Sequence, residues 1–123
     1  MRKPNILCIC AKGLNRSHYL AKYLRNKGYK TKYSGIEFSA PNPVNEFQVD
    51  WADVIIVVRK RLVPILRKKF KINNKKIIVL DVTDSKRLIP EYYAHLKKVN
   101  HEKFQRAWTR PQLRKAIKEY LPL

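Results

Sequence analysis

The sequence predicts an α/β domain in which a doubly wound sheet of about four parallel strands carries helices on both faces. Short apolar runs alternate along the chain with segments whose apolar residues recur every three or four positions. This alternation is typical of strands joined by right-handed helical crossovers. The chain has 123 residues, of which 45% are hydrophobic, and this is the size and composition of one domain with its own core. We therefore expect residues 1–123 to form a single domain.

Four segments are expected to form the strands. Three of them are nearly continuous apolar runs, as strands buried on both faces of a parallel sheet are: Asn5–Cys10, Asp53–Val58 and Lys76–Asp81. The fourth, Lys30–Tyr33, is more polar and is followed by a Ser-Gly pair that ends it.

Five segments have the spacing of amphipathic helices. The first, residues 17–28, places Tyr19 and Tyr23 four positions apart and stops at Gly28. In the second, residues 44–51, we expect Phe47 and Trp51 to point inward. The other three are residues 62–70 with Pro64 in the first turn, residues 90–99, and residues 111–121. Residues 99–123 are expected to form a C-terminal helical extension that packs on the domain.

The charge balance is strongly basic, with 28 Lys and Arg against 9 Asp and Glu and a formal net charge of +19. Such a surface attracts polyanions, among them nucleic acid and phosphorylated protein. A basic composition that the organism uses generally is the alternative explanation.

Several function classes are excluded by simple patterns. The longest uninterrupted apolar run is Ile6–Ala11, far short of the roughly 20 residues that cross a bilayer, so no membrane partner is expected. The three histidines and two cysteines match no zinc-ligand spacing, so we expect no metal and no cofactor. Cys8 and Cys10 lie two positions apart in one expected strand, a geometry that suits no disulfide. We therefore expect a reducing, cytoplasmic setting.

The segment between the first strand and the first helix carries the most specific pattern. Cys10 is followed by five residues, then Arg16 and Ser17. A loop in this place can turn its backbone N–H groups toward one point, and the helix N-terminus adds partial positive charge there. Arg16 can bind two phosphate oxygens, and the same field stabilises a thiolate at Cys10. A phosphate cradle with a thiolate at its floor predicts phosphoryl transfer through a phosphocysteine.

The simpler interpretation makes Cys10 a core cysteine and Arg16 a solvated surface charge. A chance match of this spacing is uncommon in a chain of this composition, at roughly one in a hundred, and the strand–loop–helix setting makes it rarer. Cys8 fails the same test because Leu14 stands six residues after it, so we expect Cys8 to be a core residue.

With this loop, the sequence resembles the low-molecular-weight protein tyrosine phosphatases, in particular their short predicted-phosphatase branch. That family has the same Cys-x5-Arg-[Ser/Thr] loop after its first strand. Residues 33–37 resemble the turn that ends its second strand, residues 51–58 resemble its third strand, and residues 78–84 resemble the strand end that bears its general acid. The resemblance covers about residues 4–98.

The resemblance implies a role for each matching residue. Cys10 would be the nucleophile, Arg16 the phosphate clamp, and Asp81 the acid that protonates the leaving oxygen and then activates water. Ser17 would hydrogen-bond the thiolate. The cradle would be lined by Ala11, Lys12, Gly13, Leu14, Asn15 and Arg16.

Two departures from the family pattern bear on these roles. Gly13 stands where the family often has an asparagine in a left-handed conformation, which glycine adopts more easily. The family's Asp-Pro-Tyr acid loop is absent, because Asp81 is followed by Val82 and Thr83. Asp84 is therefore a rival to Asp81 for the acid role, and the expected phosphotyrosine preference is weakened.

The sequence thus predicts a cysteine-dependent phosphomonoester phosphatase acting on phosphoprotein, with phosphotyrosine as the expected substrate. One alternative is a basic module that binds nucleic acid or phosphoprotein through the cradle with little turnover. The other is a phosphatase that acts on RNA-linked phosphate.

Overall fold

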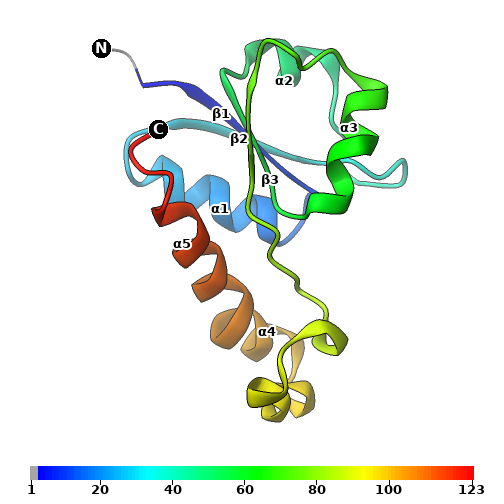
Figure 1. Ribbon diagram of the computed structural model, residues 1–123, viewed down its shortest axis with the longest axis vertical. Coiled ribbons are helices and arrows are strands. Elements are labelled where there is room, and N and C mark those ends of the chain that lie inside the picture. The colour runs from blue at the N-terminus through cyan, green and yellow to red at the C-terminus, as the bar shows by residue number, and fades with distance from the viewer. Residues whose placement is uncertain (1–2) are drawn as a thin grey trace.

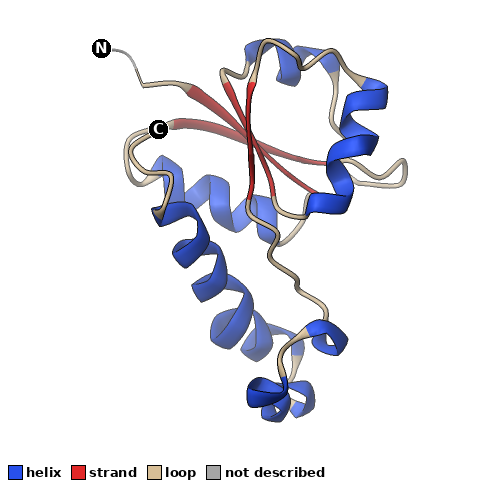
Figure 2. Cartoon of the chain, viewed as in Figure 1, coloured by secondary structure: helices blue, strands red, loops and turns tan. Residues whose placement is uncertain are grey.

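The central sheet of the molecule has four parallel strands. A computed structural model describes residues 3–123. The strands are β1 (Asn5–Cys10), β2 (Lys30–Gly35), β3 (Val54–Val57) and β4 (Lys76–Val79), and they lie in the order β2-β1-β3-β4 (Figures 1 and 2). The register sets Cys10 at the end of β1 opposite Gly35 at the end of β2. The predicted doubly wound parallel sheet is confirmed.

Helices cover both faces of this sheet. They are α1 (Arg16–Arg25), α2 (Glu46–Trp51), α3 (Val63–Lys69), α4 (His101–Phe104) and α5 (Arg110–Lys118). In Figure 1, α1 and α5 lie on one side of the strands, and α2 and α3 lie on the other. Each crossover returns the chain to a parallel strand, so the carboxyl ends of all four strands meet at one edge.

The alternation of side chains along β1 divides the core into two layers. Ile6, Cys8 and Cys10 face the layer that contains α1 and α5, whereas Leu7 and Ile9 face the layer of α2 and α3. This follows from the two-residue period of a strand. The thiol of Cys10 therefore lies at the carboxyl end of β1, on the face of the sheet that α1 covers.

The segment after β4 leaves the sheet and returns through the C-terminal helices. Two 3₁₀ segments, Lys86–Leu88 and Glu91–Lys98, form the lower lobe in Figure 1. A small satellite core lies beneath them, made by Ile89, Leu96, Phe104 and Trp108. Between α4 and α5 the helix widens into a π-helical turn, Gln105–Thr109.

The C-terminal helix belongs to the main core of the domain. The side chains of Leu113 and Ile117 are fully buried, and they pack in the same cluster as Cys8 and Cys10. Helix α5 therefore packs on the same face of the sheet as α1.

One expectation about the helices is wrong. Phe47 is 86% exposed rather than inward, because Asn45 caps α2 by accepting a hydrogen bond from the Gln48 N–H. That start directs Val49 to the core, and a residue two positions earlier lies on the opposite side of a helix. Residues 91–98 are helical, as expected, but they form 3₁₀ turns, with Tyr93 in a non-helical conformation.

Candidate active site

The loop between β1 and α1 curls around the sulfur of Cys10. Cys10 is the last residue of β1 and is 3% exposed. The backbone N–H of Gly13 donates a hydrogen bond to Cys10 Sγ at 3.0 Å, and Ser17 Oγ lies 3.1 Å from the same sulfur. The sulfur thus has a backbone amide and a hydroxyl as partners, and both can donate to a thiolate.

Two glycines allow the loop to pack directly on the end of β2. Gly13 has a φ of +74°, and a Cβ added there would lie 2.5 Å from the Gly35 nitrogen. A Cβ on Gly35 would lie 2.4 Å from the carbonyl carbon of Lys12. No side chain fits between the two backbones at these distances. The positive φ expected at position 13 is confirmed.

Backbone hydrogen bonds then fix the loop to the segment after β2. The Ile36 N–H donates to the Cys10 carbonyl at 2.9 Å, and the Glu37 N–H donates to the Ala11 carbonyl at 3.0 Å. The loop is therefore held by main chain on both sides before any ligand arrives.

Arg16 lies beneath the surface at the start of α1, with 6% of its surface exposed. Its Nη1 donates to the Val82 carbonyl at 2.8 Å, and its Nε lies 3.3 Å from Asp84 Oδ2. Burial lowers the pKa of Arg16, and the negative charge of Asp84 opposes that shift. The segment after β4 thus anchors the guanidinium from one side.

The two candidate aspartates occupy different places. Asp84 contacts Arg16, as just described. Asp81, which has a φ of +53°, is turned toward the segment after β3. Its Oδ1 accepts a hydrogen bond from the Lys60 N–H at 3.0 Å and lies 3.7 Å from Arg59 Nε. The structure therefore brings Cys10, Ser17, Arg16 and Asp84 together and places Asp81 on the neighbouring turn.

Sequence reasoning missed the Val82 carbonyl that holds Arg16. A backbone acceptor leaves no signal in the amino-acid pattern, and only the path of the chain after β4 places it.

Cationic side chains surround the loop. Lys12 Nζ lies 2.7 Å from Glu37 Oε2 and donates to Ser39 Oγ at 2.8 Å. The hydrogen bond from Lys12 lowers the pKa of the Glu37 carboxyl. Arg59 and Arg61 lie close enough for their charges to lower the pKa of Arg16. An anion approaching the cradle therefore meets positive charge from the loop itself and from residues 59–61.

Residues 3–123 contain no group of three or more His, Cys, Asp or Glu side chains that could hold a metal ion. No helix within this range is both long enough and apolar enough to cross a bilayer.

Comparisons with known proteins agree on the fold. No protein-family model and no curated protein sequence matches the chain. Among solved structures, the YwlE arginine phosphatase from Geobacillus stearothermophilus is 19% identical and superimposes with a TM-score of 0.64, over 95% of this chain and 90% of the other. The tyrosine phosphatase AmsI of Erwinia amylovora is 14% identical with a TM-score of 0.67, over 98% and 92%.

A low-molecular-weight phosphotyrosine phosphatase from Vibrio cholerae O395 gives the same result, with 14% identity, a TM-score of 0.63 and 97% of each chain covered. The chain therefore has the α/β fold of the low-molecular-weight phosphatases. The likeness covers more of the chain than the residues 4–98 over which the sequence resemblance was expected.

Proposed function

We propose that this protein is a cysteine-dependent phosphomonoester phosphatase that acts on phosphoprotein. The observation that carries the proposal is the setting of Cys10. Its sulfur lies at the floor of a strand–loop–helix turn, 3.0 Å from the Gly13 amide nitrogen and 3.1 Å from the Ser17 hydroxyl oxygen, with Arg16 at the start of the adjoining helix. A structural core cysteine needs none of these partners.

In the first step, the Cys10 thiolate attacks phosphorus in line with the ester oxygen. The S–P bond forms as the P–O bond breaks, and the leaving oxygen receives a proton from an aspartate. The loop amides and Arg16 stabilise the negative charge on the three equatorial oxygens. In the second step water attacks phosphorus, its proton passes to the same aspartate, and the thiolate leaves with Ser17 as hydrogen-bond donor.

We assign the proton transfer to Asp84 rather than to Asp81. Closeness to the reacting atoms is the first requirement for a general acid. Asp84 contacts the phosphate clamp Arg16, whereas the carboxylate of Asp81 is engaged by Arg59 and the Lys60 amide. Asp81 is the alternative general acid. The leaving-group dependence of the Asp84→Asn and Asp81→Asn variants distinguishes the two aspartates.

Phosphotyrosine is the substrate that we propose. The side chain of Phe38 is 98% exposed. Its neighbours in sequence, Glu37 and Ser39, both contact Lys12 of the cradle loop, so Phe38 lies beside that loop. An exposed ring beside the cradle can pack against the ring of a phosphotyrosine. The structural neighbours include proteins described as arginine phosphatase and as tyrosine phosphatase, so phosphoarginine is the substrate to compare first.

The basic binding module remains the second candidate, because the net charge of +19 favours polyanions of any kind. It predicts tight, salt-sensitive binding of a 5′-phosphorylated oligonucleotide without hydrolysis of any aryl phosphate.

The decisive experiment measures hydrolysis of p-nitrophenyl phosphate by the wild type, Cys10→Ser and Cys8→Ala. We expect Cys10→Ser to fall to the background rate while it still binds inorganic phosphate, and Cys8→Ala to remain active. A Cys10→Ser variant as active as the wild type would refute the proposal. A panel of phosphotyrosine, phosphoserine and phosphoarginine peptides with the phosphorylated oligonucleotide then ranks the substrates.

A further inference from the structure

An indole hydrogen bond joins the segment after β4 to the C-terminal helical segment. Trp108 Nε1 donates to the Thr83 carbonyl at 3.0 Å. Thr83 stands between the two residues that hold Arg16. The Val82 carbonyl accepts from the guanidinium, and Asp84 forms the ion pair with it. The carbonyl of Thr83 belongs to the same planar peptide unit as the N–H of Asp84, so the indole holds the peptide unit that leads into the proposed general acid.

Few other polar contacts fix this segment. Residues 80–85 belong to no helix or strand, and their last hydrogen bond toward the sheet runs from the Val82 N–H to the Val58 carbonyl at 2.7 Å. In the part of the chain that the structure describes, residues 83–85 have one other hydrogen-bonded or ionic link to a distant segment besides the ion pair of Asp84, and it is the indole bond. The place of the Asp84 carboxylate therefore depends on that bond.

The indole is itself held firmly. Trp108 is 7% exposed and packs in the satellite core with Ile89, Leu96 and Phe104. Its ring meets the ring of Tyr93 at a centroid distance of 4.9 Å and an interplanar angle of 66°. Side chains packed in a core occupy single rotamers, so the donor has a fixed position from which to hold the segment.

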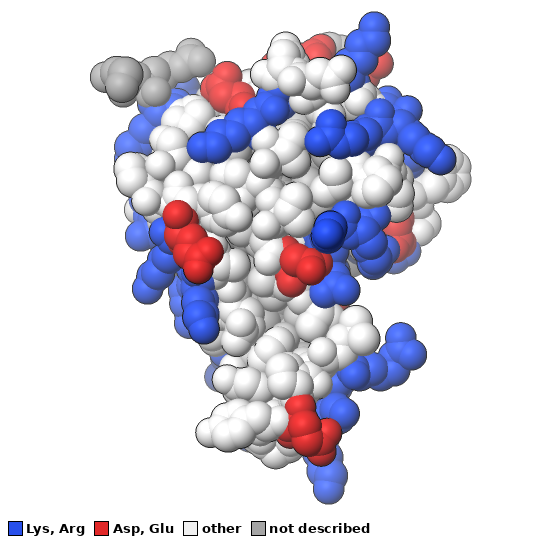
Figure 3. Space-filling view, in the orientation of Figure 1, with Lys and Arg blue, Asp and Glu red and all other residues white. Residues whose placement is uncertain are grey.

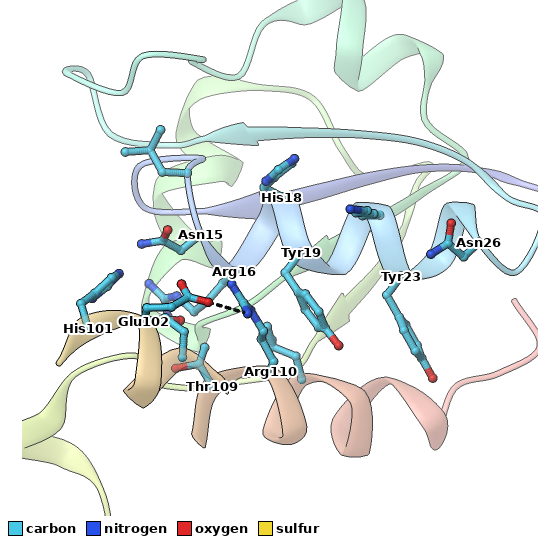
Figure 4. Close-up of a pocket in the computed structure, with 14 residues that line it drawn as sticks. Asn15, Arg16, His18, Tyr19, Tyr23, Asn26, His101, Glu102, Thr109 and Arg110 are labelled. Atoms are coloured by element: carbon cyan, nitrogen blue, oxygen red, sulfur yellow. Dashed lines mark hydrogen bonds and ion pairs between the residues drawn. The ribbon is translucent and has the colours of Figure 1, made fainter. Parts of the chain in front are cut away.

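An irregular turn brings this donor to the candidate site. Trp108 lies in the π-helical turn Gln105–Thr109 between α4 and α5, and such turns occur often at functional sites. The next residue, Thr109, lines the same cavity as Arg16, and Figure 4 shows both of them where the C-terminal helical segment passes the start of α1. The turn thus places a residue from the end of the chain beside the cradle.

We propose that Trp108 is a positioning residue for proton transfer in the proposed phosphatase. Its indole N–H fixes the Thr83 peptide unit and thereby the reach of the Asp84 carboxylate toward the leaving oxygen. A general acid must lie within hydrogen-bond distance of the atom that it protonates, and a small displacement lowers the rate steeply. The inference rests on the proposed function and on the assignment of the acid to Asp84.

The test compares two variants of the satellite core. Trp108→Phe keeps a ring there but removes the donor, whereas Phe104→Leu loosens the same core and leaves the indole bond in place. Phenyl phosphate and p-nitrophenyl phosphate are the substrates, and the assays run well below the thermal midpoint of each variant.

The two variants should differ in activity. We expect Trp108→Phe to lower kcat for phenyl phosphate about tenfold, the loss expected when one hydrogen bond no longer holds the acid. Its KM, and its kcat for p-nitrophenyl phosphate, should change less than about twofold, because that leaving group needs no proton and substrate binding does not use the acid. Phe104→Leu should lower the midpoint through lost packing and change both kcat values less than about twofold.

A double-mutant cycle shows whether the indole acts through the acid. In the Asp84→Asn background the carboxylate that needs positioning is gone, so Trp108→Phe should then lower kcat for phenyl phosphate less than about twofold. A role in folding alone would give the same loss in both backgrounds.

A measurement on the unaltered chain tests the inference even if Trp108→Phe does not fold. The chain has two tryptophans and therefore two indole N–H signals in its NMR spectrum. We expect vanadate in the cradle to shift the Trp108 signal, because Arg16 connects the oxyanion to the segment that accepts from the indole. Trp51 packs on the other face of the sheet, so its signal is the internal control and should not move.

Three results would each overturn this inference alone. The first is an active wild type with a Trp108→Phe variant that loses no more activity than Phe104→Leu. The second is an equal loss from Trp108→Phe with and without Asp84→Asn. The third is an unmoved Trp108 signal at saturating vanadate. A wild type without hydrolysis that depends on Cys10 would instead overturn the proposed function, and this inference with it.

Discussion

At the scale of single residues, the most informative side chain is Arg16. A guanidinium with 6% exposure needs partners because desolvation penalises its charge. The Val82 carbonyl and the Asp84 carboxylate supply them from one segment. For the proposed role of Arg16 in binding phosphate, this means that the guanidinium is oriented before substrate arrives, which reduces the entropy that binding must remove.

The first prediction distinguishes the two aspartates by how strongly the effect of each substitution on kcat depends on the leaving group. Asp84→Asn should lower kcat for phenyl phosphate by about 10²–10⁴, the usual contribution of a general acid. Its effect on p-nitrophenyl phosphate should be smaller, because that leaving group needs no proton. Asp84→Asn should also weaken inhibition by vanadate, since Arg16 loses a partner.

Asp81→Asn is the matched control in the same assay, and we expect it to change either rate only a few-fold. The assignment is contradicted if Asp81→Asn shows the leaving-group effect and Asp84→Asn does not. That result would restore the role that the family resemblance implied for Asp81.

The second prediction concerns the two thiols. Burial, reinforced by the charge of Cys10, raises the pKa of the fully buried Cys8. A raised pKa keeps this thiol protonated through the neutral range, so it should not react with iodoacetamide in the folded chain. We expect mass spectrometry of the labelled peptide to find Cys10 alkylated and Cys8 unmodified at neutral pH.

Inorganic phosphate should protect Cys10 from this labelling, because it fills the cradle above the sulfur. Labelling of Cys8 at the same rate as Cys10 in the native protein would contradict the prediction. In denaturant both thiols should react alike.

Much of the cradle could be predicted from the sequence, because its geometry is local. The spacing from Cys10 to Arg16 and Ser17 and the glycine at position 13 define one strand–loop–helix turn, and the structure builds that turn. The contact between Arg16 and Asp84 could not be predicted in the same way. It depends on the path of residues 80–85, which have no periodic pattern and lie far from the loop in sequence.

At the scale of elements, the packing of the loop on the end of β2 decides the shape of the cradle. The backbones of Gly13 and Gly35 are in direct contact, so neither position has room for a Cβ atom. The strand pairing that sets Cys10 opposite Gly35 therefore also sets the position of the loop amides.

The third prediction tests this close approach with two alanine substitutions. Gly13→Ala must adopt a positive φ, at about 1–2 kcal/mol, and its Cβ would also lie 2.5 Å from the Gly35 nitrogen. We expect it to displace the loop, abolish turnover and lower the free energy of unfolding by more than that amount.

Gly28→Ala is the control for the conformational cost alone. Gly28 has a φ of +97°, but an added Cβ would meet only the flexible end of Lys3. It should cost about 1–2 kcal/mol of unfolding free energy and leave activity intact, as measured by urea unfolding and p-nitrophenyl phosphate hydrolysis. Equal losses of activity in both variants would mean that the close approach does not matter.

The elements also show where sequence patterns fail. Strands β1 and β3 are recognisable as apolar runs because both of their faces are buried. Strand β4 is also an apolar run, although it lies at the edge of the sheet and only Ile78 is buried. In helix α2, the orientation of Phe47 was predicted wrongly. A helix of six residues can turn any of several apolar faces toward the core, and the cap at Asn45 determines which face is buried. Residues 86–98 fold as 3₁₀ turns around the small core of Ile89 and Trp108, a packing that no local periodicity encodes.

At the scale of the whole molecule, the charge distribution is the dominant feature. Figure 3 shows Lys and Arg side chains around the borders of one face, with Asp and Glu in few, separate places. With a net charge of +19, the surface potential reaches beyond single contacts, although salt at physiological strength screens it within about 8 Å.

The fourth prediction follows from this field. KM for a phosphotyrosine peptide flanked by acidic residues should be lower than KM for a peptide with neutral flanks at low salt. The difference should disappear as sodium chloride is raised, because screening removes the long-range attraction. Steady-state kinetics over a salt series measures both values. A preference that persists unchanged at high salt would point to specific contacts instead of the overall field.

The position of α5 has a consequence for how the protein is made. Leu113 and Ile117 pack in the cluster that contains Cys8 and Cys10, and the ribosome adds them long after the cradle loop has left the exit tunnel. Until residues 110–118 dock, a growing chain holds β1 without the α5 side of its core. We therefore expect a chain that stops before α5 to lack the proposed phosphatase activity.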